Sequence, residues 1–306
     1  MIYYNVALQP PLPQDVWQAW NWDLLLILGL LATGLLYVRG IFRLWQRAGD
    51  GRAVSYGQAL AFAGGWLALV VALVSPLDAL GSALLAAHMV QHLTLTLLAA
   101  PLLVLGAPPV ALAWGLPHSR KLARWWHKRV ALRRAWRLLS RPTVAWAIHL
   151  VILWLWHLPA LYQAALLDER VHILEHTSFL GAALLFWWTI VPRRLRRPRN
   201  LRRSLGPGPL YTFTTALLSG LLGVLLTFSQ SVWYPSYGVL PYGWGLTPLQ
   251  DQQLAGVIMW FPGGLVYLAA TLVLLGTALR RPRRARGVQG KDGAVVAPQR
   301  PLKMQS

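Results

Sequence analysis

The 306-residue sequence contains no cysteine, and only nine of its residues are Asp or Glu, against 29 Lys and Arg. Without cysteine the chain has no disulfides, no thiolate metal ligands and no cysteine nucleophile. Charged residues make up 12% of the chain, about half the share typical of a soluble domain, whereas 56% of the residues are hydrophobic. This composition indicates a membrane protein in which almost the whole chain forms a single apolar bundle.

The apolar residues are grouped into runs whose lengths approach the ~20 residues that a helix needs to cross a bilayer. Seven such runs are present, at residues 24–38, 56–74, 84–105, 143–157, 172–191, 209–229 and 254–279. We therefore predict an all-α, polytopic membrane protein with a seven-transmembrane-helix bundle over residues 24–280. An outer-face segment (1–23) precedes the predicted bundle, and a disordered cytoplasmic tail (281–306) follows it.

Every Lys and Arg except Arg170 lies either after the last run or in one of three loops, at 39–55, 116–142 and 192–208. These positions alternate along the predicted topology, so the positive-inside rule places the N-terminus outside and the C-terminus in the cytoplasm. The basic loops are then topology determinants that can contact anionic inner-leaflet lipid, and no nucleic acid is expected as a partner. The tryptophan-rich loop 116–142 is predicted to form an amphipathic helix on that leaflet.

Two pairs of histidines interrupt the apolar runs: His88 with His92, and His172 with His176. Residues four apart on a helix point from the same face, so each pair presents two imidazoles together. Ionisable groups within a membrane segment are costly, and they are interpreted as functional by default. The predicted topology puts both pairs at comparable depths near the outer face.

His157 is predicted to reach the same end of the bundle from the fourth run. Imidazoles without thiolates suit Cu, Zn, Fe or Ni. The predicted metal ligands are His88, His92, His157, His172 and His176. Four residues on the same side are predicted to support that site: Asp78, Glu175, Asp251 and Met259. Asp78 also fits a helix-capping role, Met259 also fits simple packing, and the role of His149 stays open.

The residues leave several interpretations open. A metal-handling assembly factor would use the histidines as ligands open to the outer face. A membrane cytochrome would use one histidine from each of two facing helices as axial haem ligands. An intramembrane zinc metalloprotease is suggested by His172-x-x-Glu175-His176, which matches the inverted zincin pattern. Hydrogen bonding between helices is the plainest alternative.

Four sequence blocks carry a resemblance to a known family. The blocks are His88-Met-Val-Gln-His92, Leu155-Trp-His-Leu-Pro-Ala-Leu-Tyr162, His172-x-x-Glu-His176 and Thr247-Pro-Leu-x-Asp-Gln-Gln-Leu-Ala-Gly256. In order and spacing they resemble the CtaG-type, seven-span cytochrome c oxidase assembly factors. The resemblance implies a protein of the bacterial cytoplasmic membrane, without enzymatic turnover, that helps to mature a haem–copper oxidase.

The same resemblance implies that the bound metal is copper, and that the protein supplies or positions it for the oxidase. It further implies two kinds of partner, namely cytochrome c oxidase subunits and a copper donor on the outer face. The identity of that donor and of the receiving subunit lies beyond the sequence.

Overall fold

The computed structural model describes residues 10–117, 119–191 and 207–279. Over these residues the secondary structure is entirely helical, without a β-strand, which confirms the predicted fold class. The predicted tail 281–306 and almost all of the basic loop 192–208 lie outside the described residues.

Among the described residues, six helical segments are long and apolar enough to cross a membrane. They are α1 (Leu24–Ala48), α2 (Tyr56–Leu73), the continuous segment Leu85–Leu105, α11 (Glu169–Ile190), α13 (Gly208–Thr227) and α14 (Pro248–Leu279). A seventh apolar helix, α9 (Pro142–Trp156), has only 15 residues and meets the preceding helix at a bend of 73°. The structure therefore has the architecture of a multi-pass membrane protein, while the count of seven spans and the orientation of the termini stay predictions.

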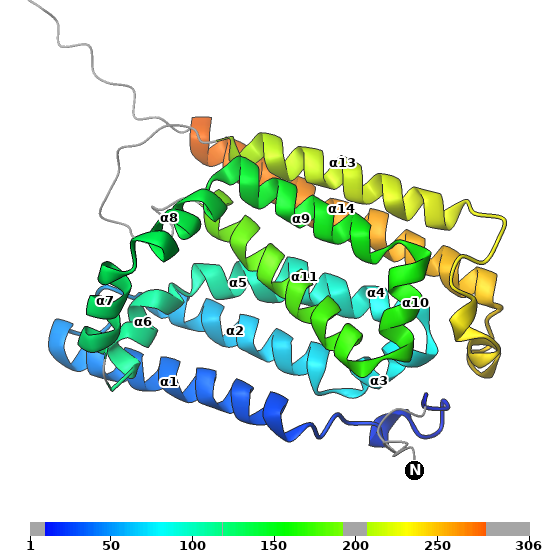
Figure 1. Cartoon of the computed structure of the whole chain (residues 1–306), viewed down its shortest axis with the longest axis horizontal. Helices are drawn as coiled ribbons and strands as arrows, with labels where there is room; N and C mark the ends of the chain where they lie inside the picture. The colour runs from blue at the N-terminus through cyan, green and yellow to red at the C-terminus, as the bar shows by residue number, and fades with distance from the viewer. Residues whose placement is uncertain (1–9, 118, 192–206, 280–306) are drawn as a thin grey trace, which may run out of the picture.

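The histidine-bearing helices lie in the middle of the bundle (Figure 1). The segment Leu85–Leu105 comprises α4 (Leu85–Leu93), a π-helical stretch (Thr94–Ala99) and α5 (Ala100–Leu105). It packs against α2, α11 and α14, whereas α1 and α13 form opposite edges of the molecule. The polar side chains of His88, Gln91 and His92 on α4, and of Glu175 and His176 on α11, are therefore buried among neighbouring helices.

Short helices cover the two ends of the bundle (Figure 1). At one end lie α3 (Pro76–Ala83), α10 (Pro159–Leu167) and the aromatic loop 230–246; at the other lie α6 (Pro108–Gly115), α7 (Ser119–Lys128) and α8 (Val130–Leu139). The loop 116–142, for which the sequence predicts one amphipathic helix, forms two. The break falls at Arg129, whose ψ of 81° is incompatible with a continuous helix.

The π-helical stretch begins two residues after His92 and is hydrogen-bonded to α11. A π-helical turn displaces the regular hydrogen-bond ladder, and such turns often occur at functional sites. Here the backbone oxygen of Thr96 accepts a hydrogen bond of 2.9 Å from the indole nitrogen of Trp187 on α11. This buried bond holds α11 against the segment Leu85–Leu105, about one helical turn after His92.

Candidate metal centre

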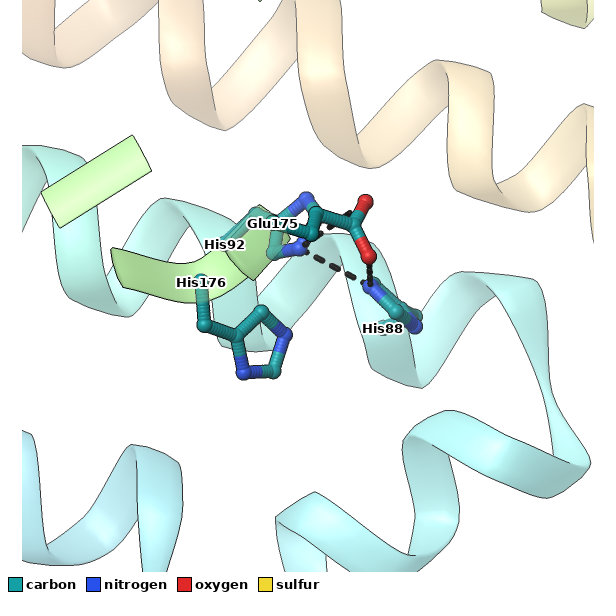
Figure 2. Close-up of side chains that lie close together, drawn as sticks. All are labelled: His88, His92, Glu175 and His176. Atoms are coloured by element: carbon teal, nitrogen blue, oxygen red, sulfur yellow. Dashed lines mark hydrogen bonds and ion pairs between the residues drawn. The ribbon is translucent and has the colours of Figure 1, made fainter. Parts of the chain in front are cut away.

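Four buried side chains from two helices meet in the centre of the bundle (Figure 2): His88 and His92 from α4, and Glu175 and His176 from α11. One potential ligand atom from each lies within 4.8 Å of the others. We call these four residues the His/Glu group. Three of the four paired histidines, predicted to share one site, therefore meet between α4 and α11, while His172 does not belong to the group.

Close polar contacts organise the His/Glu group. The Nε2 atoms of His88 and His92 are 2.8 Å apart and share a hydrogen bond. Each of these nitrogens is also 3.7 Å from a carboxylate oxygen of Glu175 (Figure 2). The ring of His176 completes the group, 5.5 Å from the His88 ring and 5.2 Å from the His92 ring between centroids.

Several polar atoms of the His/Glu group have no hydrogen-bond partner. These atoms are both carboxylate oxygens of Glu175, Nδ1 of His92 and Nε2 of His176. Glu175 has no exposed surface, so water does not solvate its carboxylate from outside. Because a buried polar group without a partner is costly, such a cluster calls for a bound species. Three imidazoles and one carboxylate are a donor set that fits a transition-metal ion.

His172 lies beside the His/Glu group. Its ring is 4.2 Å from that of His176 and 5.6 Å from that of His88 between centroids, and its side chain is partly exposed. Glu175, which the sequence predicts only as a supporting residue, occupies the position nearer to His88 and His92. The geometry of α11 explains this difference. Glu175 and His176 project from the part of α11 that meets α4, whereas His172 lies one turn nearer the start of the helix.

His157 and His92 both lie close to the ring of Phe179. The Phe179 ring is 4.4 Å from the His92 ring and 6.2 Å from the His157 ring between centroids. His157 and Met259 line, with His92, a cavity of about 40 Å³. Two of the predicted residues are thus near the His/Glu group but face a separate space.

Asp78, on α3, contacts the histidine-bearing helix α4 through Gln91. Its carboxylate accepts hydrogen bonds from the amide of Asn21 (2.8 Å) and from the amide of Gln91 (2.7 Å). Gln91 stands on α4 between the two histidines and also donates to the backbone oxygen of Ala72. Burial raises the pKa of the Asp78 carboxyl above its ordinary value. The only feature of the sequence that pointed to Gln91 as the partner of Asp78 was its position between two histidines.

Three tyrosines near the His/Glu group were not predicted as site residues. The hydroxyl of Tyr237 donates to the backbone oxygen of Gly81 (3.0 Å) and lies 2.8 Å from the hydroxyl of Tyr162. The hydroxyl of Tyr234 donates to the backbone oxygen of His157 (2.8 Å). Tyr162 itself lies 5.2 Å from the ring of His88 between centroids. For Tyr234 and Tyr237 the signal in the sequence was the aromatic composition of the loop 230–246, which here closes over the end of the bundle nearest the histidines.

These features define a class: a multi-pass helical membrane protein with a buried histidine–carboxylate group between two central helices. Residues 35–281 match the family model described as cytochrome c oxidase caa3 assembly factor (Caa3_CtaG), and the chain belongs to that family. The match covers both histidine pairs, and the resemblance seen in the sequence is confirmed.

The curated relatives include uncharacterized proteins of three mycobacteria. Those of Mycobacterium bovis and Mycobacterium tuberculosis are each 27% identical over 299 residues, which is 93% of this chain and 42% of the relative. That of Mycobacterium leprae is 25% identical over 291 residues, 90% of this chain and 42% of the relative. The chain thus spans about two fifths of the length of these relatives. No solved structure matches the chain.

Proposed function

We propose that this protein binds a copper ion at the His/Glu group and delivers or positions it while a haem–copper cytochrome c oxidase is assembled. The family to which the chain belongs is one of cytochrome c oxidase assembly factors. A haem–copper oxidase needs copper, and the histidine blocks that resemble the family are the ones that form the His/Glu group. Metal binding thereby connects the site to the family's role in assembly.

The observation that carries this proposal is the carboxylate of Glu175. It is completely buried, both of its oxygens lack a hydrogen-bond partner, and two imidazole nitrogens lie 3.7 Å away. A buried anion without a counter-charge is strongly unfavourable. A metal cation among the four side chains supplies that charge and binds imidazole nitrogens at the same time.

An ion suits this space better than a haem does. Phe179 and Tyr162, both buried, pack directly against His92 and His88. The cavity beside them measures about 40 Å³, which is room for a few water molecules and far from enough for a porphyrin ring. The bis-histidine haem interpretation would need these helices to separate.

The opposite end of the bundle supports a lipid partner within the same proposal. Trp126 from α7 and Arg133, Trp136 and Arg137 from α8 line a surface pocket of about 310 Å³. Arginine donors beside indole rings suit the phosphate of an anionic headgroup at the membrane surface. We include anionic inner-leaflet lipid among the partners, together with oxidase subunits and an outer-face copper donor.

Metal analysis of the purified full chain in detergent tests the copper site. After removal of metal with a chelator, the protein is titrated separately with copper and with zinc, and the bound metal is measured by elemental analysis. We expect copper to bind stoichiometrically and the double variant His88→Ala, His92→Ala to lose one equivalent. His127→Ala, which removes an exposed histidine of α7, is the matched control and should bind as the parent does.

Two results would contradict the proposal. A Soret absorption band from stoichiometric haem in the purified protein would replace copper with haem. Unchanged cytochrome c oxidase content in cells that carry the double alanine variant would remove the role in assembly.

A further inference from the structure

A second polar site lies next to the His/Glu group, inside the cavity that His92 borders. The cavity is formed where α4, α9, α11, α13 and α14 approach one another. Its lining includes His92, His149, His157, Met89 and Met259, together with apolar residues and the hydroxyl groups of Thr96, Ser219 and Tyr267. No Asp or Glu belongs to this lining, so the donors that it offers are neutral.

His157 is held with one ring nitrogen free. Its Nδ1–H donates to the backbone oxygen of Leu153 at 2.7 Å, and its own backbone oxygen accepts the hydroxyl of Tyr234. The first bond fixes the tautomer and the orientation of the ring and leaves Nε2 as an acceptor, while the second holds the backbone of His157. Nε2 has no hydrogen-bond partner, and it is buried, since only 4% of His157 is exposed. This arrangement, in which one nitrogen is anchored to a carbonyl and the other is free, is that of a histidine metal ligand.

Two thioethers accompany His157 at the cavity. Met89 and Met259 are 1% and 7% exposed, and both line the space. Thioether sulfur with imidazole nitrogen favours a soft ion such as Cu(I), whereas a carboxylate favours harder, divalent ions. The cavity therefore differs chemically from the His/Glu group, which contains Glu175.

His92 connects the two places. Its Nε2 faces His88 and Glu175, while its Nδ1 has no hydrogen-bond partner and its ring lines the cavity. His92 thus borders both places, with Nε2 toward the His/Glu group and its ring against the cavity. His149 also lines the cavity. Its Nε2 is bonded to the hydroxyl of Tyr267, and its Nδ1 has no hydrogen-bond partner.

We propose that this cavity is a second cation position, specific for a soft monovalent ion, with His157 and Met259 as ligands. The ion's identity as Cu(I) rests on the proposed function; the site itself rests on the free Nε2, the thioether and the cavity. The competing occupant is water, because the cavity has room for a few molecules that could bridge the free nitrogens.

The test is a titration of the purified full chain with Cu(I) in competition with a chromophoric Cu(I) chelator. X-ray absorption at the copper edge is recorded at one and at two equivalents. We expect two equivalents to bind, with sulfur scattering from the second. The variant His157→Gln, Met259→Leu should keep one equivalent, with nitrogen and oxygen scattering only. The variant His88→Ala, His176→Ala should also keep one, now with sulfur scattering. His127→Gln is the control.

The two proposals fail in different ways. A single equivalent in the parent protein overturns the second position and indicates a water-filled cavity. A sulfur signal that survives Met259→Leu overturns Met259 as the ligand at that position. If the variant His88→Ala, His176→Ala loses no copper, the proposed function is overturned instead. If the variant His157→Gln, Met259→Leu is not monodisperse, the single variant Met259→Leu tests the second position in its place. The sulfur signal of the parent protein is measured without any variant.

Discussion

The carboxylate of Asp251 accepts hydrogen bonds from the backbone N–H groups of Leu85, at 2.7 Å, and of Ala86, at 3.0 Å. These residues are 166 and 165 positions apart in the chain. The first N–H groups of a helix have no partner within it, and Leu84, the residue before α4, has no side chain able to cap them. A residue of α14 thus caps the helix that carries His88 and His92.

Replacing Asp251 by Ala should destabilise the protein and weaken metal binding together. The change leaves two buried N–H groups without acceptors, which costs about 1–3 kcal/mol. Thermal unfolding in detergent and copper affinity measure the two effects. Asp23→Ala, which removes an exposed cap of α1 at Leu26, should lower stability slightly and leave copper affinity alone. Equal losses of affinity in both variants would show that Asp251 has no special link to the site.

Replacing Glu175 by Gln should change stability and metal affinity in opposite directions. Without metal, the variant should be more stable by about 1–3 kcal/mol, because a neutral amide replaces a buried carboxylate without partners. Copper affinity should fall by a factor of about 10 or more, because a charged ligand is lost. The measurements are unfolding of the chelator-treated protein and competitive copper titration. A variant less stable than the parent without metal would contradict the view of Glu175 as an unpaired anion.

Replacing Gly223 by Ala should disrupt the contact between α13 and α14. A Cβ atom at Gly223 would lie 2.8 Å from the backbone oxygen of Gly256 and 2.9 Å from Cβ of Trp260, closer than packing allows. We expect a loss of about 1–3 kcal/mol in the free energy of unfolding. Gly220→Ala on the same helix meets nothing within 4 Å and should be neutral or slightly stabilising. Similar unfolding temperatures for the two variants would refute the close contact.

Replacing Tyr237 by Phe should speed the exchange of metal without changing its ligands. The variant loses the hydrogen bonds to Gly81 and Tyr162 that hold the loop 230–246 against α3 and α10. The two hydrogen bonds contribute about 1 kcal/mol each, so the open state of the loop should become roughly thirtyfold more populated. The rate at which a chelator removes bound copper measures this change. Tyr242→Phe, in an exposed part of the same loop, should leave the rate unchanged, and an equal rate in the Tyr237 variant would exclude the loop as a barrier.

The apolar runs predicted the helices because a membrane span must be long, continuous and apolar whatever surrounds it. The run 56–74 corresponds to α2 at Tyr56–Leu73, and the run 209–229 to α13 at Gly208–Thr227. The run 24–38 was too short by ten residues, because α1 continues to Ala48 through residues whose charges ended the apolar pattern. A helix does not stop where its hydropathy falls, since its hydrogen bonds continue.

The sequence by itself determined the all-helical, membrane-spanning character of the protein and the pairing of its histidines on single helix faces. Both follow from local properties: the apolar length of a segment and the periodicity of 3.6 residues per turn. Only the tertiary structure decided that α4 faces α11, that Glu175 joins three histidines, and that His157 turns toward a separate cavity. Those relations depend on how helices rotate and pack against one another, and neither hydropathy nor spacing within one helix carries that information.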